Sequence, residues 1–310
     1  MPQSFTDSRI LPNPPSYCRH GHPDLEKAKK FFADFGLILA LEKDDKIYFR
    51  GFGIDQFCYV AEKTSDGKRK LRATLGSCSP LPSWRRQPSC RAQRRSMTLT
   101  HRAEETWSLS KTDLLGEKVT LIYGQEDRVP EPRERPDRDL PPKAHKLGHY
   151  GYEVNVDKIH EVFGWYVKTF NRKRADTLFQ PRRNKTVMKL IPLDKGKEDV
   201  EHHSILIAGS PELKEGIKAH HTSSKVDDVD SGVLGHHYLR KGYMDVVRAG
   251  RHVLDSHIFD YCFDSSRFIV EHCVDSDLVN KDSPHADEPA VAATVSGWGR
   301  PDDSCLQIPP

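Results

Sequence analysis

Apolar and polar positions follow two periods along this chain, one of a helix and one of a strand. Residues 24–35 carry apolar side chains at the spacing of one helix face, namely Leu25, Ala28, Phe31, Phe32 and Phe35. Gly36 comes next, so we expect the helix to end there. Two short apolar runs, 46–53 and 56–63, then predict two strands with a turn between them.

The same order of elements recurs after residue 145. The second unit predicts a strand, an amphipathic helix and two strands, over residues 146–154, 157–170, 186–193 and 202–209. The third unit predicts the same succession over residues 217–226, 228–243, 257–263 and 267–274. This recurrence is an internal repeat that is visible in the pattern more than in residue identity. It indicates an α+β fold made of tandem strand–helix–strand units.

Segments without a period suggest the domain boundaries. Residues 128–145 are rich in proline and charge, so we expect a linker between an N-terminal domain over 16–127 and a C-terminal domain over 146–280. Polar ends over 1–15 and 281–310 predict a disordered leader and a disordered tail.

Residues 76–112 fit neither period. Six arginines lie between positions 85 and 102, together with prolines and cysteines. An irregular basic surface loop is one interpretation, but a loop of this length is unusual inside a domain. We hypothesise that the segment is out-of-frame or intron-derived sequence, and a clean in-frame transcript would refute this. The apolar run 117–125 predicts a strand that closes the domain.

Composition excludes several classes of function. The 48 basic residues exceed the 45 acidic residues by 3, and outside the stretch 85–102 they are scattered among acidic residues, which argues against a nucleic-acid partner. There is no apolar run long enough to span a membrane and no apolar core of a secretory signal near the N-terminus. The 7 cysteines are spread without a CxxC pair, which favours a reducing compartment, the cytoplasm. The 16 histidines are the unusual feature.

Three residues in the predicted strands are candidate metal ligands. His149 and His221 lie in the first strands of two successive repeats, so they would converge if the repeats pack about a pseudo-twofold axis. Taken singly, each could be a structural or exposed histidine. Glu271 lies in the apolar run 267–274, where its carboxylate must be exposed, paired or bound to a metal. Two imidazoles and one carboxylate suit non-haem Fe(II) and its O2 chemistry, although zinc hydrolases use the same ligand types.

The segment GRHVLDSHIFDYCFDSSRFIVE, residues 250–271, resembles the signature of type I extradiol ring-cleaving dioxygenases. These enzymes belong to the vicinal oxygen chelate superfamily, with glyoxalase I. Five positions fall in register with that signature: Gly250, His252, Tyr261, Asp264 and Glu271. The resemblance covers residues 17–75 and 117–282. It implies tandem βαβββ modules paired into two domains, with the metal site in the C-terminal domain.

The resemblance also implies roles for individual residues. It makes His149, His221 and Glu271 the ligands of Fe(II), or of Mn(II), with His220 as the alternative to His221. The acid–base histidine would be His203, with His202 as its alternative. His252 and Tyr261 would contact the substrate oxygens. The implied reaction cleaves a catechol-type ring with O2, and the implied partners are a small aromatic diol and further copies of the chain.

The chain also departs from the signature. Ser265 replaces a proline, Arg267 replaces a glycine, and Asp260 replaces an apolar residue. Arginine carries a steric cost if the turn requires a positive φ. Two alternatives therefore stay open: a glyoxalase-like or epoxide-opening metalloenzyme, and a catalytically impaired binding homologue. The pairs His236–His237 and His20 with His22 are interpreted as solvated or salt-bridged and not as ligands.

Overall fold

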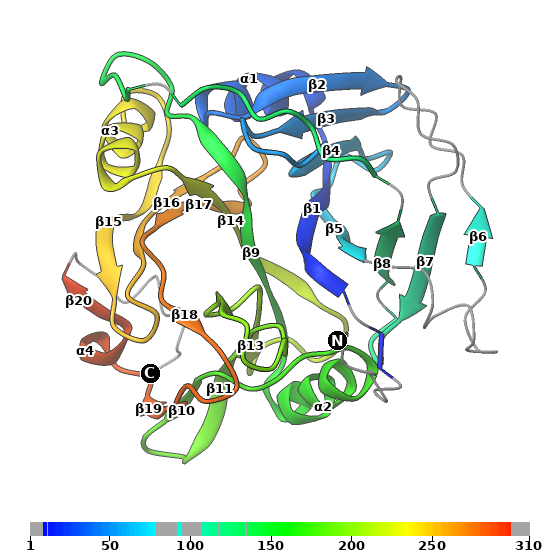
Figure 1. Cartoon of the computed structure of the whole chain (residues 1–310), viewed down its shortest axis with the longest axis vertical. Helices are drawn as coiled ribbons and strands as arrows, with labels where there is room; N and C mark the ends of the chain where they lie inside the picture. The colour runs from blue at the N-terminus through cyan, green and yellow to red at the C-terminus, as the bar shows by residue number, and fades with distance from the viewer. Residues whose placement is uncertain are drawn as a thin grey trace.

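Two mixed β-sheets form the framework of the chain (Figure 1). The computed structural model describes residues 9–10, 12–78, 92–94, 107–116, 118–123, 125–133 and 135–298. Most of the irregular segment 76–112 lies outside these residues. The hypothesis that this segment is out-of-frame sequence therefore concerns residues outside the described part of the chain.

The N-terminal sheet has the strand order β2-β3-β4-β1-β5-β8-β7-β6. Its strands are β1 (Pro12–His22), β2 (Ile38–Lys43), β3 (Lys46–Arg50), β4 (Tyr59–Lys63), β5 (Lys70–Cys78), β6 (Ala92–Arg94), β7 (Trp107–Thr112) and β8 (Lys118–Tyr123). Helix α1 (Leu25–Asp34) follows β1. At the centre of the sheet, β1 and β5 run antiparallel and join its two halves.

The C-terminal sheet repeats this plan in the order β19-β10-β11-β13-β9-β14-β17-β16-β15-β20. The first half holds β9 (Ala144–Asn155), η2 (Val156–Lys158), α2 (Ile159–Thr169), β10 (Thr177–Gln180), β11 (Lys185–Ile191) and β13 (Ile205–Ser210). The second half holds β14 (Lys218–Val226), α3 (Val229–Leu239), β15 (Asp245–His252), β16 (Ile258–Phe263) and β17 (Ile269–Val274). A small separate sheet pairs β12 (Val200–Glu201) with β18 (Leu278–Val279). The central strands β9 and β14 pair antiparallel, as β1 and β5 do, so the α+β class and the paired βαβββ modules expected from the sequence are confirmed.

The helices begin where polar caps meet the apolar period. The carboxylate of Asp24 accepts a hydrogen bond from the Lys27 amide at 3.1 Å and caps α1. In the same way, Asp228 caps α3 through the Ser231 amide at 2.7 Å. The predicted apolar face of α1 is buried through Ala28, Phe31 and Phe32. The helix therefore follows from local sequence, and its burial from the sheet beneath it.

The end of α1 packs directly on the C-terminal domain. The ring of Phe35 stacks on the imidazole of His272 with 3.9 Å between centroids. The Nε2 of His272 donates a hydrogen bond to the Phe35 carbonyl at 2.8 Å, which satisfies a carbonyl left free at the helix terminus. Because His272 follows Glu271 in β17, the N-terminal domain supports the strand that carries the predicted carboxylate ligand.

The described residues near both ends, from Pro12 and up to Trp298, include strands that their composition did not predict. Strand β1 begins at Pro12, inside the predicted leader. The predicted tail forms β19 (Asp287–Pro289), α4 (Ala292–Val295) and β20 (Ser296–Trp298), where β19 pairs with β10 and β20 with β15. The prediction of disorder from residue 281 is wrong over this range. Backbone pairing at a sheet edge needs no apolar period, so composition did not reveal it.

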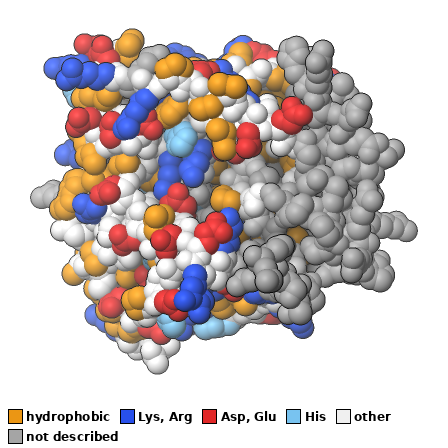
Figure 2. Space-filling view, in the orientation of Figure 1, with side chains coloured by type: hydrophobic (Ala, Val, Ile, Leu, Met, Phe, Trp, Pro, Cys, Tyr) orange, Lys and Arg blue, Asp and Glu red, His pale blue; other side chains and the backbone are white. Residues whose placement is uncertain are grey.

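Two further observations concern histidines and the surface. His20 and His22 were predicted to be solvated or salt-bridged. Both are buried against Tyr59, with His22 Nε2 2.9 Å from the Tyr59 hydroxyl, so they are not solvated, and His22 Nδ1 lies 3.9 Å from Asp264 Oδ2. His236, by contrast, pairs with Asp260 at 3.6 Å. Acidic and basic side chains are interspersed over the described part of the face in Figure 2. None of the described helices is long and apolar enough to cross a membrane.

Candidate metal centre

One row of residues across the C-terminal sheet carries the candidate ligands. Ser223 on β14 lies opposite His149 on β9 and opposite Glu271 on β17. Glu271 in turn lies opposite Tyr261 on β16. Residues that face each other across strands project from the same side of the sheet, and so does His221, two positions before Ser223 on its strand. The repeat therefore gathers two histidines and a carboxylate on one face.

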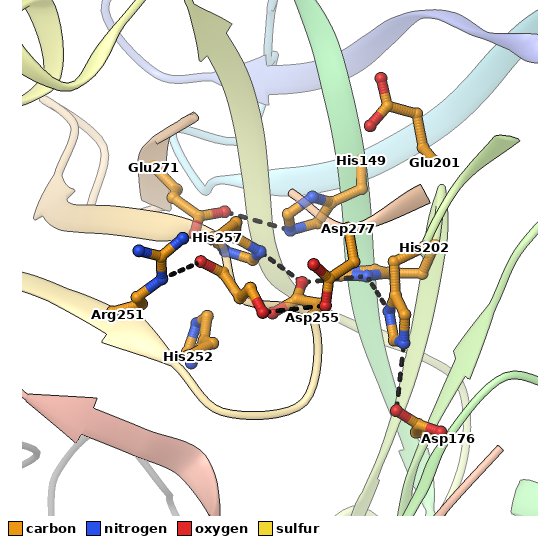
Figure 3. A network of polar contacts seen from close by, with 12 residues as sticks. His149, Asp176, Glu201, His202, Arg251, His252, Asp255, His257, Glu271 and Asp277 are labelled. Carbon is orange, nitrogen blue, oxygen red and sulfur yellow. Dashed lines mark hydrogen bonds and ion pairs between the residues drawn. The ribbon is translucent and has the colours of Figure 1, made fainter. Parts of the chain in front are cut away.

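The three candidate ligands converge on one point. His149 Nε2 lies 2.8 Å from His221 Nε2. The same nitrogen lies 3.1 Å from Glu271 Oε2 (Figure 3). His221 Nε2 lies 3.6 Å from the same carboxylate oxygen. All three side chains are buried, and Glu271 is 0% exposed. Among the described residues, the carboxylate is therefore neither exposed nor paired with a lysine or arginine, and its neighbours are histidines.

The chemistry of this donor set fits a divalent metal. Within the described residues, Glu271 Oε2 has no hydrogen-bond partner although it is fully buried. Two imidazole nitrogens 2.8 Å apart share at most one proton between them, so at least one lone pair stays available. Two histidines and one carboxylate on one side of an ion form the facial arrangement that Fe(II) and Mn(II) accept. These residues would hold the metal.

His257 and Asp255 form a second histidine–carboxylate pair, and His257 also contacts Glu271. The Nε2 of His257 lies 2.8 Å from Glu271 Oε1, and its Nδ1 makes a short contact with Asp255 Oδ2. Burial lowers the pKa of His257, but Asp255 and Glu271 outweigh it and raise that pKa to about 10. Burial would raise the pKa of Glu271, yet His149 and His257 hold it well below its usual range. Glu271 is thus an anion with one oxygen occupied and one oxygen free.

The predicted acid–base histidine lies beside the ligands. The ring of His203 is 4.2 Å from that of His149, and its Nδ1 is 3.4 Å from Asp255 Oδ2. Its neighbour His202 turns to Asp176, with 3.1 Å from Nε2 to Oδ2 (Figure 3). Burial lowers the pKa of His203 well below its ordinary value. His203 lines the pocket above the site and His202 does not, which favours the first choice over its alternative.

The two residues predicted to contact the substrate, His252 and Tyr261, also contact each other. His252 Nε2 lies 3.0 Å from the Tyr261 hydroxyl, and His252 Nδ1 donates to the Val295 carbonyl at 2.7 Å. His220 also faces the pocket, but its contact is with His221 Nδ1 at 2.7 Å and not with His149. Burial raises the pKa of the Tyr261 hydroxyl well above its usual value, so the hydroxyl keeps its proton.

A pocket opens directly over the histidines and encloses a cavity of about 120 Å³. The ligand histidines, His203, His252 and Tyr261 form its polar side. His220, Asp255, His257 and Ser296 are further polar lining residues. The remaining lining side chains are apolar: Leu178, Met188, Leu190, Leu206, Val246, Val247, Leu254, Phe259, Ile269 and Val295. An apolar pocket with a few convergent polar groups is typical of a small-molecule site.

Solved structures share this architecture. No protein-family model matches the chain, and no curated protein matches it in sequence. The 2,3-dioxygenase LapB of Pseudomonas sp. KL28 superposes with a TM-score of 0.73 at 13% identity, over 90% of this chain and 98% of LapB. Homoprotocatechuate 2,3-dioxygenase of Brevibacterium fuscum, in complex with 3,4-dihydroxyphenylacetate, gives 0.72 at 15% identity, over 96% of this chain and 93% of that chain. This chain has the extradiol dioxygenase fold.

The same fold also occurs in a Mn(II)-bound glyoxalase. A Mn(II)-bound glyoxalase of Novosphingobium aromaticivorans matches with a TM-score of 0.78 at 15% identity, over 96% of this chain and 95% of that chain. The fold resemblance expected from residues 250–271 is therefore confirmed. One of these neighbours is Mn(II)-bound, and the shared fold is that of the vicinal oxygen chelate proteins.

Sequence reasoning missed two residues of this extradiol-fold site, Asp255 and His257. Neither occupies a position of the signature, so the resemblance did not point to them. An available signal was their spacing of two residues directly before an apolar strand, which places both side chains on one side of the backbone.

The turn beside Glu271 keeps its geometry despite the substitutions. Arg267 adopts a φ of 67°, which is the left-handed conformation that the replaced glycine would favour. Asp264 holds the turn, because its Oδ1 accepts hydrogen bonds from the Ser266 amide at 2.7 Å and the Phe268 amide at 2.8 Å. Asp260, in place of an apolar residue, pairs with His272 Nδ1 at 3.3 Å.

Proposed function

We propose that this protein is an Fe(II)-dependent extradiol dioxygenase that cleaves a catechol-type ring with O2. The observation that carries the proposal is the convergence of His149 Nε2, His221 Nε2 and Glu271 Oε2 beneath an apolar pocket. A facial set of three protein ligands leaves adjacent positions for two diol oxygens and O2. The neighbours with this fold include dioxygenases, which supports the choice of reaction.

In this proposal the bound metal supplies Lewis acidity and a route for electrons between the diol and O2. Glu271 provides the anionic ligand, and His257 keeps its second oxygen occupied. His203 exchanges a proton with the substrate; because its Nδ1 faces Asp255, Nε2 is the nitrogen left for that exchange. Tyr261 and His252 hydrogen-bond the diol and orient it against the ligands.

Anaerobic loading with Fe(II), followed by a panel of catechols, tests the proposal. We expect a yellow ring-fission product and the uptake of one O2 for each ring cleaved. His149→Ala and Glu271→Gln should each abolish cleavage, because each removes one of three ligands. His237→Ala, at an exposed position in α3, is the matched control and should keep full activity. Cleavage that survives in either ligand variant would refute the ligand assignment.

A glyoxalase-like isomerase is the second candidate. The Mn(II)-bound glyoxalase has the same fold, and two histidines with one carboxylate also suit Mn(II). Thiol-dependent turnover of an α-ketoaldehyde with Mn(II), without O2 uptake, would favour this candidate over the dioxygenase. A protein that takes up no metal under anaerobic reconstitution would instead be an impaired binding homologue.

The remaining expectations belong to the same proposal. We place the enzyme in the cytoplasm, which agrees with the free thiols of Cys18, Cys58, Cys262 and Cys273. We also expect the chain to form a homo-oligomer, which light scattering of the purified protein measures directly.

A further inference from the structure

We propose that the pocket selects diols whose ring substituent is uncharged and apolar, such as an alkyl or aryl group, and rejects diols that carry a carboxylate. This inference rests on the proposed function, because it takes the diol oxygens to lie at His149, His221 and Glu271. It concerns the part of the substrate that points away from those residues.

One wall of the pocket is aliphatic and comes largely from strands that carry no candidate ligand. The ligands and their partners lie on β9, β14, β17 and β16. The opposite wall is built by β10, β11 and β13, where Leu178 faces Met188 and Leu190 faces Leu206 across the strands. Leu254 closes this wall and packs with Met188 on the cluster of Leu190 and Leu206. A ring held by its oxygens at the histidines would therefore direct its substituent into aliphatic side chains.

Among the described residues, the pocket lining contains no lysine and no arginine. Two cations that are adjacent to lining residues along the chain are turned elsewhere. Lys189 follows Met188 on β11, but its ammonium lies 4.7 Å from the centre of the Phe163 ring and 3.4 Å from the Thr177 hydroxyl. Arg251 precedes His252, but its guanidinium donates to the Ser256 carbonyl at 2.6 Å and pairs with Asp275.

The charge already buried near the pocket points the same way. Two carboxylates, those of Glu271 and Asp255, already lie next to the cavity, and both contact the imidazole of His257 between them. A substrate carboxylate in the aliphatic wall would lose its hydration without gaining a partner. An alkyl group at the same place would gain from leaving water.

A matched pair of substrates tests the inference. 4-Propylcatechol and 3,4-dihydroxyphenylacetate have side chains of similar length and differ in charge. We expect kcat/KM of the Fe(II)-loaded enzyme to be at least about 100-fold higher for 4-propylcatechol, because an unpaired buried carboxylate is costly. An acid that is cleaved equally well or better overturns the inference and leaves the proposed function intact.

Met188→Lys tests the wall itself. Met188 is only partly buried, and lysine has a similar length, so the ammonium can reach the pocket without a large cavity or clash. We expect this variant to reduce the preference for 4-propylcatechol by at least about 10-fold, through better turnover of the acid. Leu140→Lys adds the same charge at a residue that is 59% exposed and should leave the ratio within about twofold. An unchanged ratio in a folded Met188→Lys protein would contradict the placement of the substituent.

Binding separates the two proposals if no ring is cleaved. The absence of turnover on any catechol would refute the dioxygenase. Calorimetric titration of the same two diols under nitrogen, with and without Fe(II), then measures selectivity without chemistry. Tighter binding of 4-propylcatechol supports the apolar pocket. Equal or tighter binding of the acid, or binding of neither diol at millimolar concentration, overturns it.

Discussion

Asp264 is buried in the turn next to the metal centre, and its replacement by asparagine should change how stability depends on pH. Its Oδ1 accepts two backbone hydrogen bonds, whereas its Oδ2 has no hydrogen-bond partner among the described residues. The nearest base, His22 Nδ1, is 3.9 Å away and contacts Ser266 at 2.8 Å instead. Burial raises the pKa of Asp264 to about 7, and burial lowers the pKa of His22 to about 3. At mildly acidic pH both groups are therefore neutral.

The magnitude follows from the shift in the pKa of Asp264. From its usual 3.8 to about 7 is a rise of about 3 units, which corresponds to about 4 kcal/mol. Because the folded pKa lies above the unfolded pKa, the stability from the protonated carboxyl is complete below about pH 4 and is lost as pH rises through about 7. Asparagine keeps the Oδ1 acceptor and never ionises. The stability gained by Asp264→Asn should therefore grow by about 2 kcal/mol between pH 5.5 and pH 8.5.

Urea unfolding of both proteins at a series of pH values measures this difference, provided that the m-values agree. Asp127→Asn, at an exposed position, is the control and should give a difference that does not depend on pH. A flat difference for Asp264→Asn over the same range would show that the carboxyl is ionised in the folded protein. The argument from its burial would then be wrong.

Three further substitutions test other parts of the structure. Arg267→Gly should raise the free energy of unfolding by about 1 kcal/mol in urea titrations, because glycine adopts the observed positive φ without steric cost. The stacking of Arg267 on Phe263, which the variant loses, stabilises the fold by less than this steric cost. A loss of stability would mean that the stacking dominates. His257→Gln should weaken Fe(II) binding about 10- to 100-fold in competition with a chelator, since Glu271 loses the partner that orients it; unchanged affinity would rule out that role. Phe35→Ala should cost about 3–5 kcal/mol of stability, because it empties the place against His272; thermal and urea unfolding would measure the loss, and a cost below about 1 kcal/mol would show that the stacking is dispensable.

The sequence predicted those elements in which the spacing of apolar side chains alone shows the period of a helix or of a strand. The helix over 24–35 appears as α1 over Leu25–Asp34, with Asp24 as its cap. The strand over 217–226 appears as β14 over Lys218–Val226. Strand β1 escaped prediction because PNPPSYCRHGH contains three prolines and no alternation; its partners β4 and β5 specify it instead. Such a strand depends on contacts between distant residues, which a local pattern does not contain.

The residues of the candidate site also fall into those that the sequence predicted and those that it did not. His149, His221 and Glu271 were reached through repeat positions and a family resemblance, and the sheet register brings them to one point. Asp255 and His257 were not reached, because their value lies in a relation to Glu271 that only the folded chain creates. Arg267 is a third case. The sequence showed that arginine would carry a steric cost if the turn required a positive φ, and the structure shows that Arg267 does adopt a positive φ.

The stacking of Phe35 on His272 constrains how this chain can diverge. The described residues of the N-terminal domain supply no candidate ligand, yet Phe35, which directly follows α1, contacts the strand of Glu271 through its ring and its carbonyl. An exchange of N-terminal domains between relatives would transplant position 35 without its partner at 272. The two positions should therefore change together in evolution. A chimera that does not preserve this pairing should lose affinity for a metal ion at the candidate centre before it loses its fold.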